Sequence, residues 1–302
     1  MFVVTYRKIF FILSGIIVGL SFLSVAFFGL QFGIDFTGGA ITEVSYPDGR
    51  PDKVVLEEQL NPLSVEGYSL RPTGENGYIL RTRDLTEEER IIISKALSIN
   101  GTVQVVEERY NSIGPIIGTE LRNKAFFAIA IVVLAIILFI AFVFRKVSEP
   151  VSSLKYGLIA IVALLHDIII PIGMFAVLGV FVGAQVDVLF VMALLAILGY
   201  SVNDTIVVFD RVRENLRTNK ELNIREDFEL TVGKSLNQTY TRSINTSLTT
   251  LFVLLTLFFV GAPVTQNFAL VLMTGVIAGT YSSIFLAAPL LVTIQRLSEK
   301  RN

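Results

Sequence analysis

The sequence predicts an α-helical polytopic membrane protein with six transmembrane helices and a small α+β ferredoxin-like extracytoplasmic domain after the first helix. Of the 302 residues, 53% are hydrophobic and only 17% are charged, whereas soluble domains carry roughly 25% charged residues. The mean hydropathy is +0.67, and the apolar residues are concentrated in blocks. One polar stretch after the first block has the order of elements that is typical of ferredoxin-like domains.

The apolar blocks define the membrane spans. A bilayer core about 30 Å thick needs about 20 apolar residues in each helix. The blocks of this length are Ile9–Phe28, Ala125–Phe144, Gly157–Val182, Val186–Phe209, Thr241–Val260 and Phe268–Ile294. The first block is longer than the apolar run of a signal peptide, so we interpret it as an uncleaved helix. We therefore expect a first transmembrane helix in 1–30, an extracytoplasmic domain in 31–123, and a five-helix bundle in 124–302 with a cytosolic loop at 210–240.

The placement of Lys and Arg predicts the orientation, because cytoplasmic loops carry an excess of these residues. The short connections 183–185 and 261–267 contain no Lys or Arg. The segments on the other side contain Arg7, Lys8, Arg145, Lys146, Lys155, Arg211, Arg213, Arg217, Lys220, Arg225, Lys234, Arg296, Lys300 and Arg301. Both termini are therefore predicted to be cytosolic.

The polar stretch between the first two spans has strand and helix signals in the order β-α-β-β-α-β. Strands are predicted at Ile41–Pro47, Tyr68–Thr73, Tyr78–Arg83 and Thr102–Tyr110, and the middle two flank the turn Gly74–Gly77. A helix is predicted at Lys53–Asn61, and a second opens with a capping box at Thr86 and ends near Ser98. The stretch contains no catalytic constellation, so we interpret it as a docking or substrate-contacting module.

Several classes of function are excluded by composition. The chain has no Cys and one His, which excludes disulfides, thiolate metal sites and histidine-rich metal sites. We expect no cofactor, no metal and no catalytic residue. The net charge of −1 provides no basic field for nucleic acid. The phosphate-binding pattern Gly-x-x-x-x-Gly-Lys is absent from the sequence, so energy must come from a membrane gradient or a partner.

Charged residues within the spans are candidate functional groups, because they are costly in a bilayer. Asp204 follows Asn203 in the fourth span and lies about 10 Å inside Arg211 at 1.5 Å per residue. Arg242 is predicted at a similar depth in the antiparallel fifth span. It begins a polar stripe at helical spacing, made of Arg242, Asn245, Thr246, Thr249 and Thr256. Contact between Asp204 and Arg242 would couple protonation to helix movement, whereas a static ion pair or simple packing would be structural only.

The third span carries a second polar pair, His166 and Asp167, followed by Pro171. Asp167 is the stronger candidate for a proton-coupling role, since His166 is equally well explained as a packing residue. Three Gly-x-x-x-Gly motifs begin at Gly15, Gly179 and Gly275 and favour close helix packing.

Four segments of the sequence resemble the SecF family, the smaller membrane subunits of the bacterial SecD–SecF pair. They are Phe32–Gly39 after the first span, Gly114–Leu121 before the second, Gly199–Asn215 at the end of the fourth, and Thr241–Thr250 at the start of the fifth. The resemblance covers nearly the whole chain, and the fourth-span motif is the most specific.

The resemblance implies a location in the bacterial cytoplasmic (inner) membrane and a role as an accessory subunit rather than an enzyme. Such subunits pair with SecD into a unit similar to resistance-nodulation-division exporters and bind the SecYEG channel. They use the proton-motive force to complete the export of unfolded preproteins after the ATP-driven step of SecA. The family's proton-linked Asp and Arg correspond to Asp204 and Arg242, and a further Asp belongs to SecD.

Three alternatives remain open at this stage. The first is that the chain is half of another proton-driven exporter of the same superfamily, although the 92 residues of Gln31–Arg122 make a small outer domain for that role. It would be an intramembrane aspartyl protease if Asp167 and Asp204 shared a proton. It would be a non-transporting scaffold if the buried charges served assembly alone.

Overall fold

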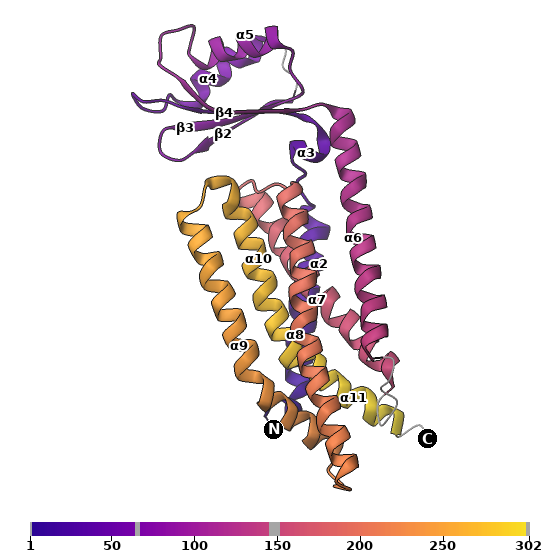
Figure 1. Cartoon of the computed structure of the whole chain (residues 1–302). Helices are drawn as coiled ribbons and strands as arrows, with labels where there is room; N and C mark the ends of the chain where they lie inside the picture. Colours follow the sequence, from indigo (N-terminus) through magenta and orange to yellow (C-terminus); the bar gives the residue numbers. More distant parts are fainter. Residues whose placement is uncertain (1, 64–66, 145–151, 300–302) are drawn as a thin grey trace. The chain divides into compact units, whose positions relative to one another are not determined.

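The computed structural model describes residues 2–63, 67–144 and 152–299, and it consists of two compact units (Figure 1). One unit, the bundle, holds the residues up to Gln31 and those from Phe127 onward. The other, the outer domain, is Phe32–Phe126. Four of the bases used to predict the orientation, Arg145, Lys146, Lys300 and Arg301, lie outside the described residues.

The outer domain contains one sheet of four antiparallel strands in the order β2-β3-β1-β4. The elements are α3 (Ile34–Thr37), β1 (Gly39–Ser45), α4 (Lys53–Leu60), η1 (Asn61–Leu63), β2 (Ser69–Thr73), β3 (Gly77–Thr82), α5 (Glu87–Leu97) and β4 (Val106–Ile113). Helices α4 and α5 pack against each other. This order confirms the predicted ferredoxin-like topology; the short α3 and η1 were not predicted.

The last strand begins at Val106, four residues later than the predicted Thr102. The chain between α5 and β4 forms a turn first, because Ile99, Asn100 and Gly101 all have positive φ. The backbone N–H groups of Gly101 and Val103 both donate to the Ser98 carbonyl, at 3.0 Å. These bonds close a compact turn that uses residues otherwise suited to a strand.

The bundle is built from helices, most of which are long. They are α1 (Phe2–Thr5), α2 (Arg7–Phe28), α6 (Pro115–Phe144), α7 (Ser153–Phe181), α8 (Val188–Glu221), α9 (Phe228–Val260), α10 (Pro263–Tyr281), the π-helical η2 (Ser282–Ala287) and α11 (Ala288–Glu299). Among the described residues, six helical spans are long and apolar enough to cross a membrane. The six predicted spans are thus confirmed as helices.

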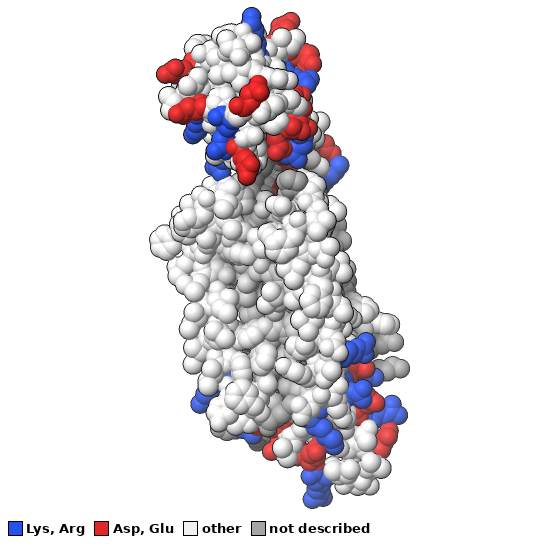
Figure 2. Space-filling view, turned by 90° about the vertical axis from the view of Figure 1, so that its left-hand side faces the viewer, with Lys and Arg blue, Asp and Glu red and all other residues white. Residues whose placement is uncertain are grey.

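Two helices extend well past the predicted spans. Helix α8 continues to Glu221, and α9 already begins at Phe228. Most of 210–240 is therefore helical, although we expected a loop there. Asp227 caps α9, since its side chain accepts a hydrogen bond from the Glu229 backbone N–H at 2.9 Å. This hairpin of helices is charged, and in Figure 2 the Lys, Arg, Asp and Glu side chains of the bundle gather at one end.

Burial separates central helices from peripheral ones. About half or more of the most apolar window is buried in α7 (50%), α8 (50%) and the α10–α11 span (67%). The corresponding shares are 11% for α2, 6% for α6 and 17% for α9. The three peripheral helices therefore present most of their apolar surface to lipid or to another chain.

Among the glycine contacts described, those of the Gly275–Gly279 motif bring two helices of the bundle close together. A Cβ on Gly275 would stand 2.3 Å from the side chain of Ile197, and one on Gly279 would stand 3.2 Å from Ser201. These glycines let α10 approach α8 closely. By contrast, no described atom lies within 4 Å of a Cβ built on Gly15 or Gly19.

Candidate functional site

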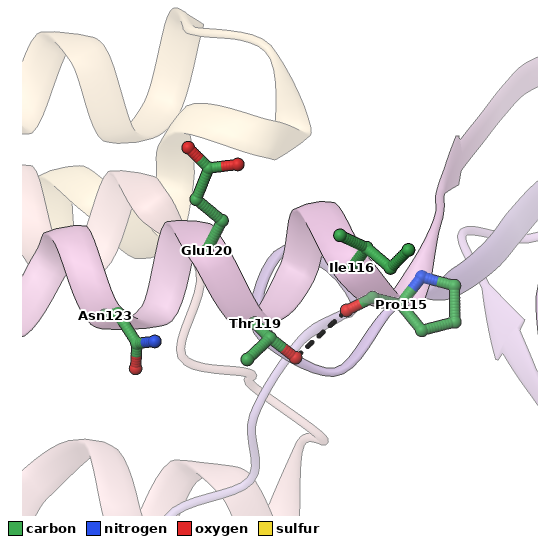
Figure 3. Close-up of a pocket in the computed structure, with 5 residues that line it drawn as sticks. All are labelled: Pro115, Ile116, Thr119, Glu120 and Asn123. Atoms are coloured by element: carbon green, nitrogen blue, oxygen red, sulfur yellow. Dashed lines mark hydrogen bonds between the residues drawn. The ribbon is translucent and has the colours of Figure 1, made fainter.

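A hollow that is open to solvent lies beside the start of α6. It is lined along one helix by Pro115, Ile116, Thr119, Glu120 and Asn123 (Figure 3). The Thr119 hydroxyl donates to the Pro115 carbonyl at 3.0 Å, so it is already satisfied within the helix. The buried polar groups of the bundle are stronger candidates, because polar groups within membrane spans are costly.

Asp204 lies on the buried face of α8, where its side chain is only 5% exposed. One carboxyl oxygen, Oδ2, is fully buried and has no hydrogen-bond partner among the described residues. The carboxyl faces α9, where Ser243 and Arg242 are its polar neighbours. A buried carboxyl with an unsatisfied oxygen is costly and marks a functional candidate.

Arg242 is exposed, in contrast to Asp204. The ion pairs between described residues include none that joins Arg242 to Asp204, so the predicted direct contact is wrong for this conformation. The reason is the helical phase of α9: Ser243 and Ser247 face the bundle, which turns the adjacent Arg242 outward. Asp204 and Arg242 are near each other but unpaired.

The other predicted site residues on these two helices also face outward. Asn203, Asn245, Thr246 and Thr249 are exposed. The Thr249 hydroxyl donates to the Thr246 carbonyl at 2.8 Å, one of the back-bonds by which hydroxyls are satisfied in membrane helices. The stripe from Arg242 to Thr249 therefore forms a polar surface on the outside of this bundle.

The structure gathers a different set of polar groups around Asp167, whose side chain is 0% exposed. Its Oδ2 accepts hydrogen bonds from Ser201 of α8 and from Ser282 of η2, the latter at 2.7 Å. Its Oδ1 lies 2.8 Å from Nδ1 of His166. The cluster therefore joins α7, α8 and the π-helical segment.

A second hydroxyl contact extends this cluster. Thr205 lies one residue after Asp204, and its Oγ1 is 3.1 Å from Oγ of Ser283. Ser282 and Ser283 were not predicted as site residues, because they stand inside an apolar span. Two consecutive serines in such a span were the available signal, but nothing in the sequence indicates that they begin a π-helix.

Two of the segments that resemble the SecF family, Phe32–Gly39 and Gly114–Leu121, meet within the outer domain. A Cβ on Gly118 would stand 2.7 Å from the Gly38 backbone nitrogen, and one on Gly38 would stand 2.7 Å from the Pro115 Cα. Gly38 and Gly39 also have positive φ, at 75° and 122°. This junction therefore requires glycine for both space and backbone conformation.

Family models match most of the chain. The model described as "Protein export membrane protein SecD/SecF, C-terminal" matches residues 93–297, and "SecD/SecF GG Motif" matches residues 23–46. The chain is also 39% identical to the protein translocase subunit SecF of Thermobaculum terrenum, with 96% of this chain and 93% of that protein covered. It is 37% identical to the SecF subunit of Anaerolinea thermophila, with 98% and 94% covered.

Solved structures show the same architecture. The chain matches the crystal structure of SecDF, a translocon-associated membrane protein from Thermus thermophilus, with a TM-score of 0.82 and 28% identity. The match covers 97% of this chain but 38% of that chain. SecDF in its super-membrane-facing form matches with a TM-score of 0.65 and 30% identity, covering 99% and 39%. On the family models and these relatives together, this chain belongs to the SecD/SecF family of protein export membrane proteins.

Proposed function

We propose that this chain is the SecF-type half of a proton-driven accessory unit of the Sec translocase. With a SecD-type partner it uses the proton-motive force to complete preprotein export through SecYEG after the ATP-driven step of SecA. It resides in the bacterial cytoplasmic membrane with both termini in the cytosol, and it acts as a transport subunit rather than an enzyme. Family membership supports the accessory role.

The observation that carries the proposal is the state of Asp204. Its buried Oδ2 lacks a hydrogen-bond partner, and the nearby Arg242 points out of the bundle. A shift of α9 that brings Arg242 to Asp204 favours the ionised carboxylate, and a shift that parts them favours the protonated acid. The pair is thus an element whose protonation depends on helix position.

The exposed polar stripe of α9 supports the need for a partner chain. A surface that presents Arg242, Asn245 and Thr246 is costly in contact with lipid. A SecD-type six-helix unit that covers α9 would bury this stripe, and Asn203 and Arg242 would then line the interface. The solved SecDF chains that match are more than twice as long as this chain, which leaves room for such a unit.

The proposal is tested by measuring how far preprotein export depends on a proton gradient. The chain is reconstituted with a SecD-type partner and SecYEG in vesicles, and completion of a stalled preprotein is measured with and without an imposed proton gradient. Asp204→Asn and Arg242→Met are expected to abolish the gradient-dependent part and to leave the ATP-driven part intact. Thr256→Val, a change further along the same stripe, serves as the matched control. Unchanged export in Asp204→Asn with assembly intact would refute the proton-coupling role and favour a scaffold.

A second candidate is a different exporter of the same superfamily, which moves lipid or small molecules. The outer domain offers it little support, because its core is filled by side chains such as Tyr46, Leu56 and Leu97. A hydrophobic substrate recovered with the purified outer domain would favour this alternative.

A further inference from the structure

The Asp167 cluster, which consists of Asp167, His166, Ser201 and Ser282, holds more polar groups than helix packing requires. Its carboxyl is completely buried at the meeting of α7, α8 and η2. The ion pairs between described residues bring no Lys or Arg to it; the one basic group in contact is His166. A buried charge without a compensating partner is expensive, so the charge balance of this cluster depends on its protons.

The two ring nitrogens of His166 have different surroundings. Its Nδ1 lies 2.8 Å from Asp167, but its Nε2 is buried and has no hydrogen-bond partner among the described residues. A doubly protonated ring would leave an N–H of a cation facing an apolar environment. A ring with a single N–H, on Nδ1, fits this geometry, and such a ring brings no full positive charge to the Asp167 carboxyl.

Ser282 is placed to respond to a proton on Asp167. Its hydroxyl has one hydrogen and two acceptors in reach, Oδ2 of Asp167 at 2.7 Å and the Gly279 carbonyl at 3.1 Å. When Asp167 is ionised, the hydroxyl donates to Oδ2. When a proton binds Oδ2, the new O–H donates to Ser282 Oγ, and the serine hydrogen turns to the Gly279 carbonyl. Only one O–H bond forms, and no other covalent bond changes.

The backbone on both sides of Asp167 is suited to movement. Ser282 is the first residue of the π-helical η2, and π-bulges are frequent at functional sites. In α7, Pro171 has no N–H, so the Asp167 carbonyl lacks the usual helical donor four residues later. Helix η2 packs against α2, α7, α8 and α10, so a change within it reaches most of the bundle.

We propose that Asp167 binds and releases a proton during transport and that Ser282 transmits its protonation state to η2. This inference rests on the proton coupling proposed above and adds a second proton-binding carboxyl within this chain. The groups that contact the Asp167 carboxyl are His166 of α7, Ser201 of α8 and Ser282 of η2, and Tyr281 of α10 stacks on the His166 ring with the centroids 5.9 Å apart. The hydroxyl oxygens contact the carboxyl directly, which leaves no space between them for a metal ion and makes the proton the fitting ligand.

The experiment is infrared difference spectroscopy of the chain reconstituted with its SecD-type partner, recorded between alkaline and acidic buffer. Carbonyl stretches of protonated carboxylic acids are expected, and one of them, the Asp167 band, should disappear in Asp167→Asn and be retained in Asp204→Asn. Asn has the shape of Asp, and an amide oxygen in the place of Oδ2 still accepts from Ser201 and Ser282, so we expect the fold to be retained. Ser282→Ala should shift the frequency of this band, because it removes one hydrogen-bond partner.

Ser283→Ala is the matched control, since Ser283 lies in the same π-helical segment but bonds Thr205 and Gly279 instead of Asp167. It should leave the band in place. Retention of every band in Asp167→Asn would overturn the proton-binding role, and equal shifts in the two serine variants would overturn the link through Ser282. The proposed function is tested separately by the export experiment. It would fail if export by the Asp204→Asn variant still responded to the proton gradient.

Discussion

Gly173 of α7 faces Ser21 of α2 at backbone contact, so that a Cβ on Gly173 would stand 2.4 Å from the Ser21 Cα. Neighbouring backbone cannot rotate away as a flexible side chain can. The first span, separated from the third by the whole outer domain in sequence, is thereby held against it. Neither residue belongs to a Gly-x-x-x-Gly motif.

Gly173→Ala is expected to destabilise the bundle by about 1–3 kcal/mol or more, the usual cost of overpacking. Thermal unfolding in detergent, followed by far-ultraviolet circular dichroism, measures the change. Gly19→Ala on the same pair of helices is the control, because no described atom lies within 4 Å of the added Cβ. Equal melting temperatures for the two variants would contradict the close contact.

Glu229 joins three parts of the bundle and is expected to stabilise it. Its carboxylate pairs with Arg7 of α2 at 3.2 Å and with Arg296 of α11, and its side chain is only 20% exposed. Glu229→Gln should cost about 1–2 kcal/mol, since hydrogen bonds to partly buried charged groups exceed neutral ones. The exposed i,i+4 pair of Arg217 and Glu221 provides the comparison.

Glu221→Gln at that exposed pair should change stability by less than about 0.5 kcal/mol. The same melting experiment distinguishes the two sites. If both variants melt alike, Glu229 is no more than a surface charge.

Tyr46 connects the end of β1 to the end of α5 in the outer domain. Its ring is fully buried, and its hydroxyl donates to the Leu97 carbonyl at 3.0 Å. Burial is the main cause that raises the pKa of Tyr46 to about 12, and the electrostatic effect of Tyr78 is the second. Its contribution to stability is therefore present below pH 10, the ordinary pKa of tyrosine, and is lost as the pH rises toward 12.

Tyr46→Phe is expected to cost about 1–2 kcal/mol, because the Leu97 carbonyl loses its partner in a buried place. It should also reduce the loss of stability that occurs as the pH rises from 10 toward 12. Hydrogen exchange of α5 amides across this pH range reports both effects; unaltered protection in the variant would argue against the Leu97 contact.

Glu89 is expected to make the outer domain sensitive to acid. Its carboxylate accepts hydrogen bonds from Arg83, at 3.0 Å, and from the Thr86 backbone N–H, at 2.9 Å, and these bonds lower its pKa to about 2. The stabilising effect is complete above pH 4.5, the ordinary value, and is lost as the pH falls from there toward 2.

The capping box can be tested through the same residue. Glu89→Gln should reduce the protection of the first turn of α5 at neutral pH and remove its dependence on acid. Thr86→Ala should cost about 1 kcal/mol through loss of the cap. Hydrogen exchange of α5 at pH 7 and pH 3.5 checks both; an acid response that persists in Glu89→Gln would assign it to another carboxyl.

The elements with strong local signals were predictable from the sequence. Apolar blocks of membrane-spanning length, the capping box at Thr86 and the turn at Gly74–Gly77 each depend on residues close together in the chain. The sheet order follows from the alternation of strands and helices. The extension of α8 and α9 past the apolar region was not predictable from hydropathy, because helical hydrogen bonding continues into polar sequence.

The polar groups of the membrane spans show the same division between what the sequence predicts and what packing decides. The sequence by itself determined that Asp167, Asp204 and Arg242 stand in the spans, since hydropathy makes any charge there conspicuous. Only the tertiary structure decided their partners. The helical phase of α9 turned Arg242 outward, and the close approach of α10 at Gly279 brought Ser201 and Ser282 onto Asp167. Contacts of this kind depend on the rotation of each helix about its axis, which packing between distant segments sets.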